Sequence, residues 1–144
     1  MAEHESALVE ALGEQLIIFG EWCVASHSIQ YNYLTDWFLA FDVFERTTKC
    51  FWSVERRDQL CLTLGLAQVP IIATGRFDRK GLTELLGPSK LGAPSAEGLY
   101  MRNQEGDFLA ARAKIVAPEF RQSIGEHWSN KTLRLNRLAR ASPV

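Results

Sequence analysis

The amino-acid sequence predicts an α+β fold in which helices flank a mostly antiparallel sheet. Segments with helical spacing of apolar residues occur together with short segments rich in β-branched and aromatic residues. The dipeptide Glu105-Gly106 separates two extended segments, as in a β-hairpin, which joins antiparallel strands. The chain has 144 residues, of which 47% are apolar and 23% charged, so it provides enough material for one hydrophobic core.

The first half of the chain predicts one helix and two strands. Residues 3–15 place apolar side chains at helical spacing, and Gly13 lies near the end of this helix. Residues 16–24 (LIIFGEWCV) predict a strand. Residues 37–45 (WFLAFDVFE) predict a second strand, which carries apolar side chains on both faces and is therefore expected at the centre of the sheet.

Further elements follow the central strand. Residues 48–52 predict a hairpin partner for it. Ser53 is a suitable N-cap for a helix over 54–64, which Gly65 closes. Residues 69–74 predict another strand.

The second half predicts a short helix, an exposed loop, a hairpin and a final helix. The short helix covers 82–86 and is bounded by glycines, and turn-forming residues then cluster over 88–96. The hairpin strands are predicted at 97–104 and 107–116. Pro118 begins the last predicted helix, which covers 119–128.

A basic C-terminal tail is predicted over 129–144. Its cations recur every three residues and alternate with leucines; they are Lys131, Arg134, Arg137 and Arg140. The net charge of the whole chain is only -1, so any contact with RNA requires local clustering of the 16 basic residues. We find no internal repeat and no linker, and therefore predict a single domain over 1–144.

Cysteine usage predicts a cytoplasmic protein. Cys23, Cys50 and Cys61 are odd in number, and none of them belongs to a CxxC motif. No apolar leader follows Met1, and no apolar run approaches the length of a membrane span. A reducing cytosol is the simplest environment for such a chain.

Four sequence blocks occur in a specific order along residues 16–128. The first joins Phe19-Gly20-Glu21-Trp22 to the segment from His27 to Tyr31, and the second is Phe41-Asp42-Val43. The third is Glu97-Gly98-Leu99-Tyr100-Met101-Arg102, and the fourth is Arg112-Ala113-Lys114-Ile115-Val116. In this order the blocks resemble nucleotidyltransferase motifs III to V of ATP-dependent RNA ligases. The order is far more specific than any single block.

The resemblance implies a ligase-type nucleotidyltransferase core that uses ATP and magnesium to seal RNA ends through adenylylate intermediates. Such chemistry requires fixed cations and a metal ion at the phosphates. The resemblance assigns Lys114 and Arg112 to phosphate contacts and Glu97 to the magnesium ion. Since Arg112 and Lys114 are two residues apart on a strand, they are expected on one face. The alternative for all three is an ordinary solvated surface.

The earlier blocks supply the remaining expected nucleotide contacts. Glu21 lies in an apolar strand, where a buried carboxylate needs a partner, so it binds either the ribose of ATP, as the resemblance implies, or a structural cation. Phe41 stacks on adenine or packs in the core. His27 either contacts substrate or is satisfied by a local partner. We expect the carboxylates, cations and Phe41 to border one cleft.

The nucleophile that the resemblance implies is missing from this sequence. In RNA ligases a lysine upstream of the first block attacks ATP, but the first lysine here is Lys49. Three explanations remain open: an N-terminally truncated domain, one half of a split ligase, or a non-catalytic nucleotide- or RNA-binding remnant. A truncated sheet is also expected to expose the edge around residues 16–19, which favours self-association or a complementary chain. A protein-interaction role is therefore a further alternative.

Overall fold

The structure is a computed structural model that describes residues 2–26, 29–118 and 134–139. It divides into two compact units. Unit 1 consists of Met1–Glu21, Phe38–Val69 and Arg102–Arg112. Unit 2 consists of Trp22–Trp37, Pro70–Met101 and Ala113–Val144. The predicted helix over 119–128 lies outside the described residues, as do His27, Lys131 and Arg140.

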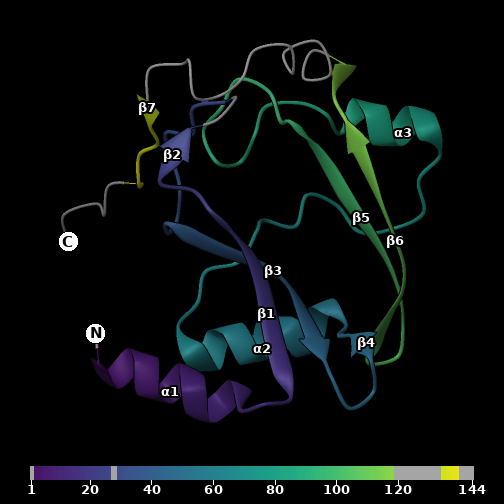
Figure 1. Cartoon of the computed structure of the whole chain (residues 1–144). Coiled ribbons are helices and arrows are strands. Elements are labelled where there is room, and N and C mark those ends of the chain that lie inside the picture. The colour runs from purple at the N-terminus through teal and green to yellow at the C-terminus, as the bar shows by residue number, and fades with distance from the viewer. Residues whose placement is uncertain (1, 27–28, 119–133, 140–144) are drawn as a thin grey trace. The chain divides into compact units, whose positions relative to one another are not determined.

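Unit 1 combines a small sheet with two helices (Figure 1). Its elements are α1 (Ala2–Leu12), β1 (Leu16–Trp22), β3 (Phe38–Glu45), β4 (Cys50–Phe51) and α2 (Val54–Leu64). The strand order is β1-β3-β4, so β3 is central and β1 lies at an edge. β4 pairs antiparallel with β3, with Phe51 opposite Phe44. α2 contacts β3, and α1 contacts α2. Helices and antiparallel strands together confirm the predicted α+β class.

The core of unit 1 forms between β3 and α2. Leu39, Ala40 and Val43 are buried, which confirms that β3 is covered on both faces. On α2, Cys61 and Leu64 are buried against them. Burial also raises the pKa of the Cys61 thiol, so this cysteine stays protonated at neutral pH.

The ends of α2 also confirm the sequence prediction. The Ser53 hydroxyl accepts a hydrogen bond from the Arg56 N–H (3.3 Å), and Gly65 closes the helix in the left-handed conformation at φ 63°. Both signals are local in the sequence, which is why they predict the boundaries well.

A long hairpin, formed by β5 (Gly98–Glu105) and β6 (Phe108–Val116), confirms another prediction (Figure 1). Gly106 occupies its turn at φ 56°, a conformation that glycine adopts without steric cost. The turn end of the hairpin is bonded within unit 1, because the Asp107 carbonyl accepts from the Ser53 N–H (2.8 Å). The Gln104 amide also accepts from the Val54 N–H and donates to Glu55.

Two predicted elements differ from the structure. The strand predicted at 69–74 is wrong. Gln68 forms a parallel bridge with Ala40 of β3, in which the Ala40 N–H donates to the Ala67 carbonyl (2.9 Å) and the Val69 N–H donates to the Ala40 carbonyl (3.0 Å). Pro70 then has no N–H with which to continue the ladder. The short helix is α3 (Arg79–Glu84) rather than 82–86, because the Asp78 carboxylate caps it by accepting from the Gly81 N–H (2.7 Å).

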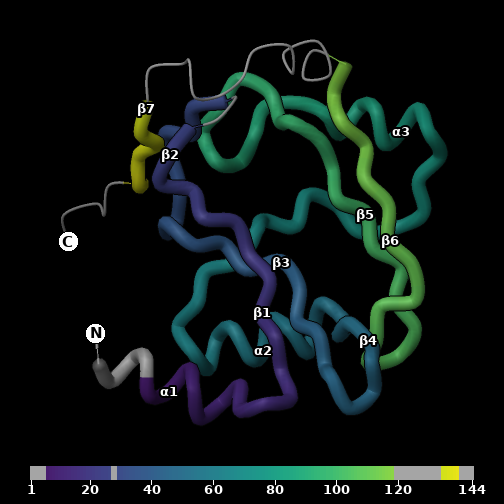
Figure 2. Tube along the Cα trace, viewed as in Figure 1, coloured from purple at the N-terminus to yellow at the C-terminus, as the bar shows by residue number. Residues whose placement is uncertain are grey.

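Unit 2 contains α3, the outer part of the hairpin and a second small sheet. In that sheet β2 (Ala25–Ser26) pairs antiparallel with β7 (Arg134–Leu135). The two segments lie side by side in Figure 2. Part of the segment predicted as a basic tail, 134–139, is therefore paired with the segment after β1. The loop over 88–96 is largely exposed, as predicted, but Ala93 anchors it by being buried. No helix in the described part of the chain is long and apolar enough to cross a membrane.

Candidate functional site

A buried carboxylate, Asp42, lies at the centre of a charged cluster in unit 1. It belongs to β3, and its side chain is only 1% exposed. Arg102 of β5 forms an ion pair with it, and Arg112 of β6 approaches it to 3.5 Å. A buried carboxylate is tolerated only when it is paired and hydrogen-bonded, so the two arginines compensate the burial of Asp42.

Arg102 is fixed by further hydrogen bonds to the backbone. Its guanidinium donates to the carbonyls of Phe41 (3.0 Å) and Trp52 (2.7 Å). Burial, followed by the nearby positive charge of Arg112, lowers the pKa of Arg102. A second buried arginine, Arg57 of α2, donates to the same Phe41 carbonyl (2.8 Å) and pairs with Asp58. Two guanidinium groups therefore fix the backbone at Phe41.

Arg112 differs from the other two arginines because it remains half exposed. Its side chain is 50% accessible to solvent although it pairs with Asp42. Its guanidinium lies over the Phe51 ring, with 4.3 Å between the guanidinium carbon and the ring centroid. Asp42 and Phe51 therefore hold the Arg112 guanidinium in place, and its exposed part is available to an anion.

The structure corrects the expectation that Glu21 is buried. Glu21 lies near the end of β1 and is exposed. The physical reason is the strand order, since β1 is an edge strand and its burial decreases toward this end. Gly20 beside it has a steric role, because a Cβ there would lie 2.2 Å from the Phe38 ring. Phe41, in the same unit, is half-buried.

Glu97 and Lys114 belong to unit 2, at the open end of the hairpin. Glu97 is half-buried in the bend before β5, and its carbonyl accepts from the Ala117 N–H (2.8 Å). Lys114 is exposed on β6. This backbone hydrogen bond joins the bend at Glu97 to the residue that follows β6. Neither residue forms an ion pair with another described residue.

Gly98 has a different role from the one its position suggests. The sequence indicates that its missing side chain leaves room for a ligand. In the structure a Cβ at this position would lie 2.1 Å from the Ile115 carbonyl oxygen of the adjacent strand. The space is therefore filled by the backbone of β6, and the glycine permits close strand pairing.

A comparison with protein families identifies the family of this chain. The family model described as RNA ligase matches residues 1–116. The chain belongs to the RNA ligase family. No curated protein and no solved structure matches it. The residues matched by the RNA ligase model contain all four sequence blocks and the whole Asp42 cluster.

The Asp42 cluster connects three of the four RNA ligase blocks within unit 1. Asp42 comes from the second block, Arg102 from the third and Arg112 from the fourth. The sequence alone did not identify Arg57 or Arg102 as members of this cluster, and it assigned no role to Asp42. A signal was present, because a carboxylate in a strand with apolar residues on both faces requires cationic partners.

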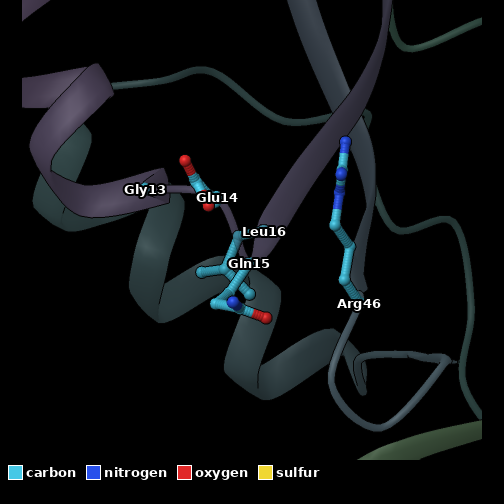
Figure 3. A pocket seen from close by; sticks show the side chains of 5 residues that line it. All are labelled: Gly13, Glu14, Gln15, Leu16 and Arg46. Atoms are coloured by element: carbon cyan, nitrogen blue, oxygen red, sulfur yellow. The ribbon is translucent and has the colours of Figure 1, made fainter.

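A surface pocket elsewhere in this RNA ligase domain contains none of the predicted site residues (Figure 3). It lies at the turn between α1 and β1 and is lined by Gly13, Glu14, Gln15, Leu16 and Arg46. The Gln15 carbonyl accepts from the Arg46 N–H (2.8 Å), which ties this turn to the end of β3. The pocket is thus a feature of the helix-to-strand junction.

Proposed function

We propose that this RNA ligase domain acts in ATP-dependent sealing of RNA ends through adenylylate intermediates. In such chemistry a nucleophile attacks the α-phosphate of ATP, and pyrophosphate leaves. The protein supplies positioning and fixed positive charge where charge develops. The observation that carries the proposal is the Asp42 cluster, in which three RNA ligase blocks meet and leave Arg112 half exposed.

The proposed roles follow the chemistry of each side chain. Arg112 and Lys114 are exposed cations suited to phosphate oxygens, which arginine binds with a planar fork and lysine as a point charge. Glu21 is an exposed carboxylate suited to the ribose hydroxyls. Phe41 supplies a half-buried ring for the adenine, on a backbone fixed by Arg57 and Arg102.

Magnesium is the metal we propose for Glu97. Among the described residues no three His, Cys, Asp or Glu side chains cluster as a protein-only metal site. Magnesium does not require such a cluster, because it commonly binds one or two carboxylates together with substrate phosphates and water. A single half-buried carboxylate therefore fits this ion, which would neutralise charge on the phosphates.

The nucleophile is the part of the reaction that this sequence does not supply in the expected place. No lysine precedes Lys49, and Lys49 itself lies in the turn between β3 and β4 at φ 56°. We therefore propose that the residues of this sequence provide nucleotide and phosphate contacts rather than the attacking lysine. One half of a split ligase is an arrangement with this division of roles. A non-catalytic remnant would keep the same contacts.

Incubation of the purified chain with α-labelled ATP and magnesium should yield no covalent protein–AMP. The expected result follows from the missing upstream lysine, and it is measured as label that survives denaturing electrophoresis. Lys49→Ala and Lys114→Ala serve as controls for adventitious attachment. A stable adduct in the wild type that disappears in Lys49→Ala would contradict the proposal and make Lys49 the nucleophile.

A further inference from the structure

Tyr33 of unit 2 presents an exposed aromatic ring on a fixed backbone. The residue is 59% exposed, although its N–H donates to the Leu91 carbonyl (3.0 Å). Gly92 packs directly against it: at φ 82°, a Cβ on Gly92 would lie 2.7 Å from the Tyr33 Cβ. The loop over 88–96 therefore supports the tyrosine from behind, and its ring remains available to a ligand.

The segment 134–139 lies beside Tyr33 on its other side. Leu34 and Leu138 form a parallel bridge, in which the Leu34 N–H donates to the Arg137 carbonyl (3.0 Å) and the Leu34 carbonyl accepts from Ala139 (2.7 Å). Leu34 is fully buried. Arg137 is bonded through its backbone to both Tyr31 and Leu34, so it lies directly beside the stretch of chain that contains Tyr33. An exposed tyrosine and an exposed arginine therefore come from adjacent stretches of backbone.

A buried asparagine fixes this segment in place. Asn136 is 5% exposed; its side-chain oxygen accepts from the Tyr31 N–H (2.8 Å), and its amide donates to the Cys23 carbonyl (2.8 Å). Two polar contacts at a buried side chain define the register of the segment against residues 23–34. Arg134 and Arg137, on either side of Asn136, are exposed.

The charge around Tyr33 favours a polyanion. The segments 29–36, 88–93 and 134–139 contain the cations Lys90, Arg134 and Arg137 and the single carboxylate Asp36. The basic groups therefore gather here although the whole chain has a net charge of -1.

We propose that Tyr33 and Arg137 form a surface that binds single-stranded RNA. An unpaired base stacks on the Tyr33 ring, and Arg137 contacts a neighbouring phosphate. This inference deepens the proposed function by naming a place in unit 2 where the RNA strand is held, and it rests on RNA being the substrate. An exposed aromatic beside an arginine is the combination that single strands require, whereas a duplex hides its bases from stacking.

Fluorescence anisotropy with a labelled single-stranded RNA of about ten nucleotides tests this surface. The full chain is titrated without ATP or magnesium. Tyr33→Ala should weaken RNA binding roughly tenfold, because aromatic stacking on a base contributes about that factor. Tyr33→Phe keeps the aromatic ring and should retain the RNA affinity of the wild type. Arg137→Ala should weaken binding and reduce the slope of log K against log salt by about one.

Matched controls are available in the same unit. Phe77→Ala removes another exposed aromatic, and Arg79→Ala another exposed cation. Both should bind RNA as the wild type does. Melting temperatures of the Tyr33 variants should equal that of the wild type, since an exposed ring contributes little to folding.

Wild-type RNA affinity in folded Tyr33→Ala would overturn the inference. Equal binding of a duplex of the same sequence would also overturn it, because stacking requires unpaired bases. If sedimentation shows that Tyr33→Ala abolishes self-association without changing RNA affinity, the surface is a protein interface and the inference is wrong. Because the RNA titration contains no ATP, failure of nucleotide binding by the chain leaves this result unaffected.

Discussion

Asp42→Ala should lower the free energy of unfolding by about 3–5 kcal/mol, which is the usual cost of removing one partner from a buried ion pair. The substitution leaves the Arg102 guanidinium buried, with 9% of its side chain exposed, next to the positive charge of Arg112. Domains of this kind have a total stability of about 5–15 kcal/mol, so a large part of it would be lost. Urea unfolding followed by tryptophan fluorescence measures the effect.

Three comparisons isolate the cause of that loss. Arg112→Ala should cost far less, because Arg112 is half exposed and its removal leaves Asp42 paired with Arg102. Asp42→Leu combined with Arg102→Met should be more stable than Asp42→Ala alone, since no unpaired charge remains buried. Glu84→Gln, in the exposed pair with Lys80, should change stability by less than about 0.5 kcal/mol. An Asp42→Ala protein as stable as the wild type would show that the cluster is not paired as described.

Gly98→Ala should separate the strands of the β5–β6 hairpin and cost roughly 1–3 kcal/mol or more, as overpacking does. The new Cβ would lie 2.1 Å from the Ile115 carbonyl oxygen, and backbone atoms cannot move aside as a flexible side chain can. We expect a melting temperature lower by roughly 5–15 °C. Faster amide exchange along β5 and β6 should accompany it.

Gly87→Ala provides the matched control for this prediction. No atom lies within 4 Å of a Cβ at that position, so the substitution should be neutral or slightly stabilising. Equal melting temperatures for the Gly98→Ala and Gly87→Ala proteins would contradict the close strand pairing. Because Gly98 follows Glu97 directly, the same displacement should also disturb the proposed magnesium ligand.

Local signals in the sequence predicted much of the fold. The boundaries of α2 follow from Ser53 and Gly65, whose effects act within a few residues. The hairpin follows from the turn at Gly106, and the central place of β3 from its apolar residues on both faces. The prediction of a strand at 69–74 was wrong because it relied on the amino-acid composition of this segment, whereas Pro70 has no N–H with which to continue a strand ladder.

The candidate site was harder to predict because its contacts are long-range. Asp42 and Arg102 are far apart in the sequence, and no spacing rule connects them. In the sequence, Glu21 and Asp42 both lie in predicted strands that are rich in apolar residues. The structure places Asp42 in a central strand and Glu21 in an edge strand, so only Asp42 needs buried cations. Strand order, which the sequence does not specify, decides between the two.

Equilibrium binding of ATP in the presence of magnesium tests the central claim most directly, because every role proposed for Glu21, Phe41, Glu97, Arg112 and Lys114 depends on this nucleotide. We expect saturable binding by the wild-type chain. Arg112→Ala and Lys114→Ala should each weaken it by roughly 10- to 100-fold, since each removes a charge-assisted contact to phosphate. Lys80→Ala, which removes an exposed cation of α3, should leave it unchanged. A folded wild-type chain that shows no saturable ATP binding, or Arg112→Ala and Lys114→Ala proteins that bind ATP as tightly as the wild type, would contradict the account.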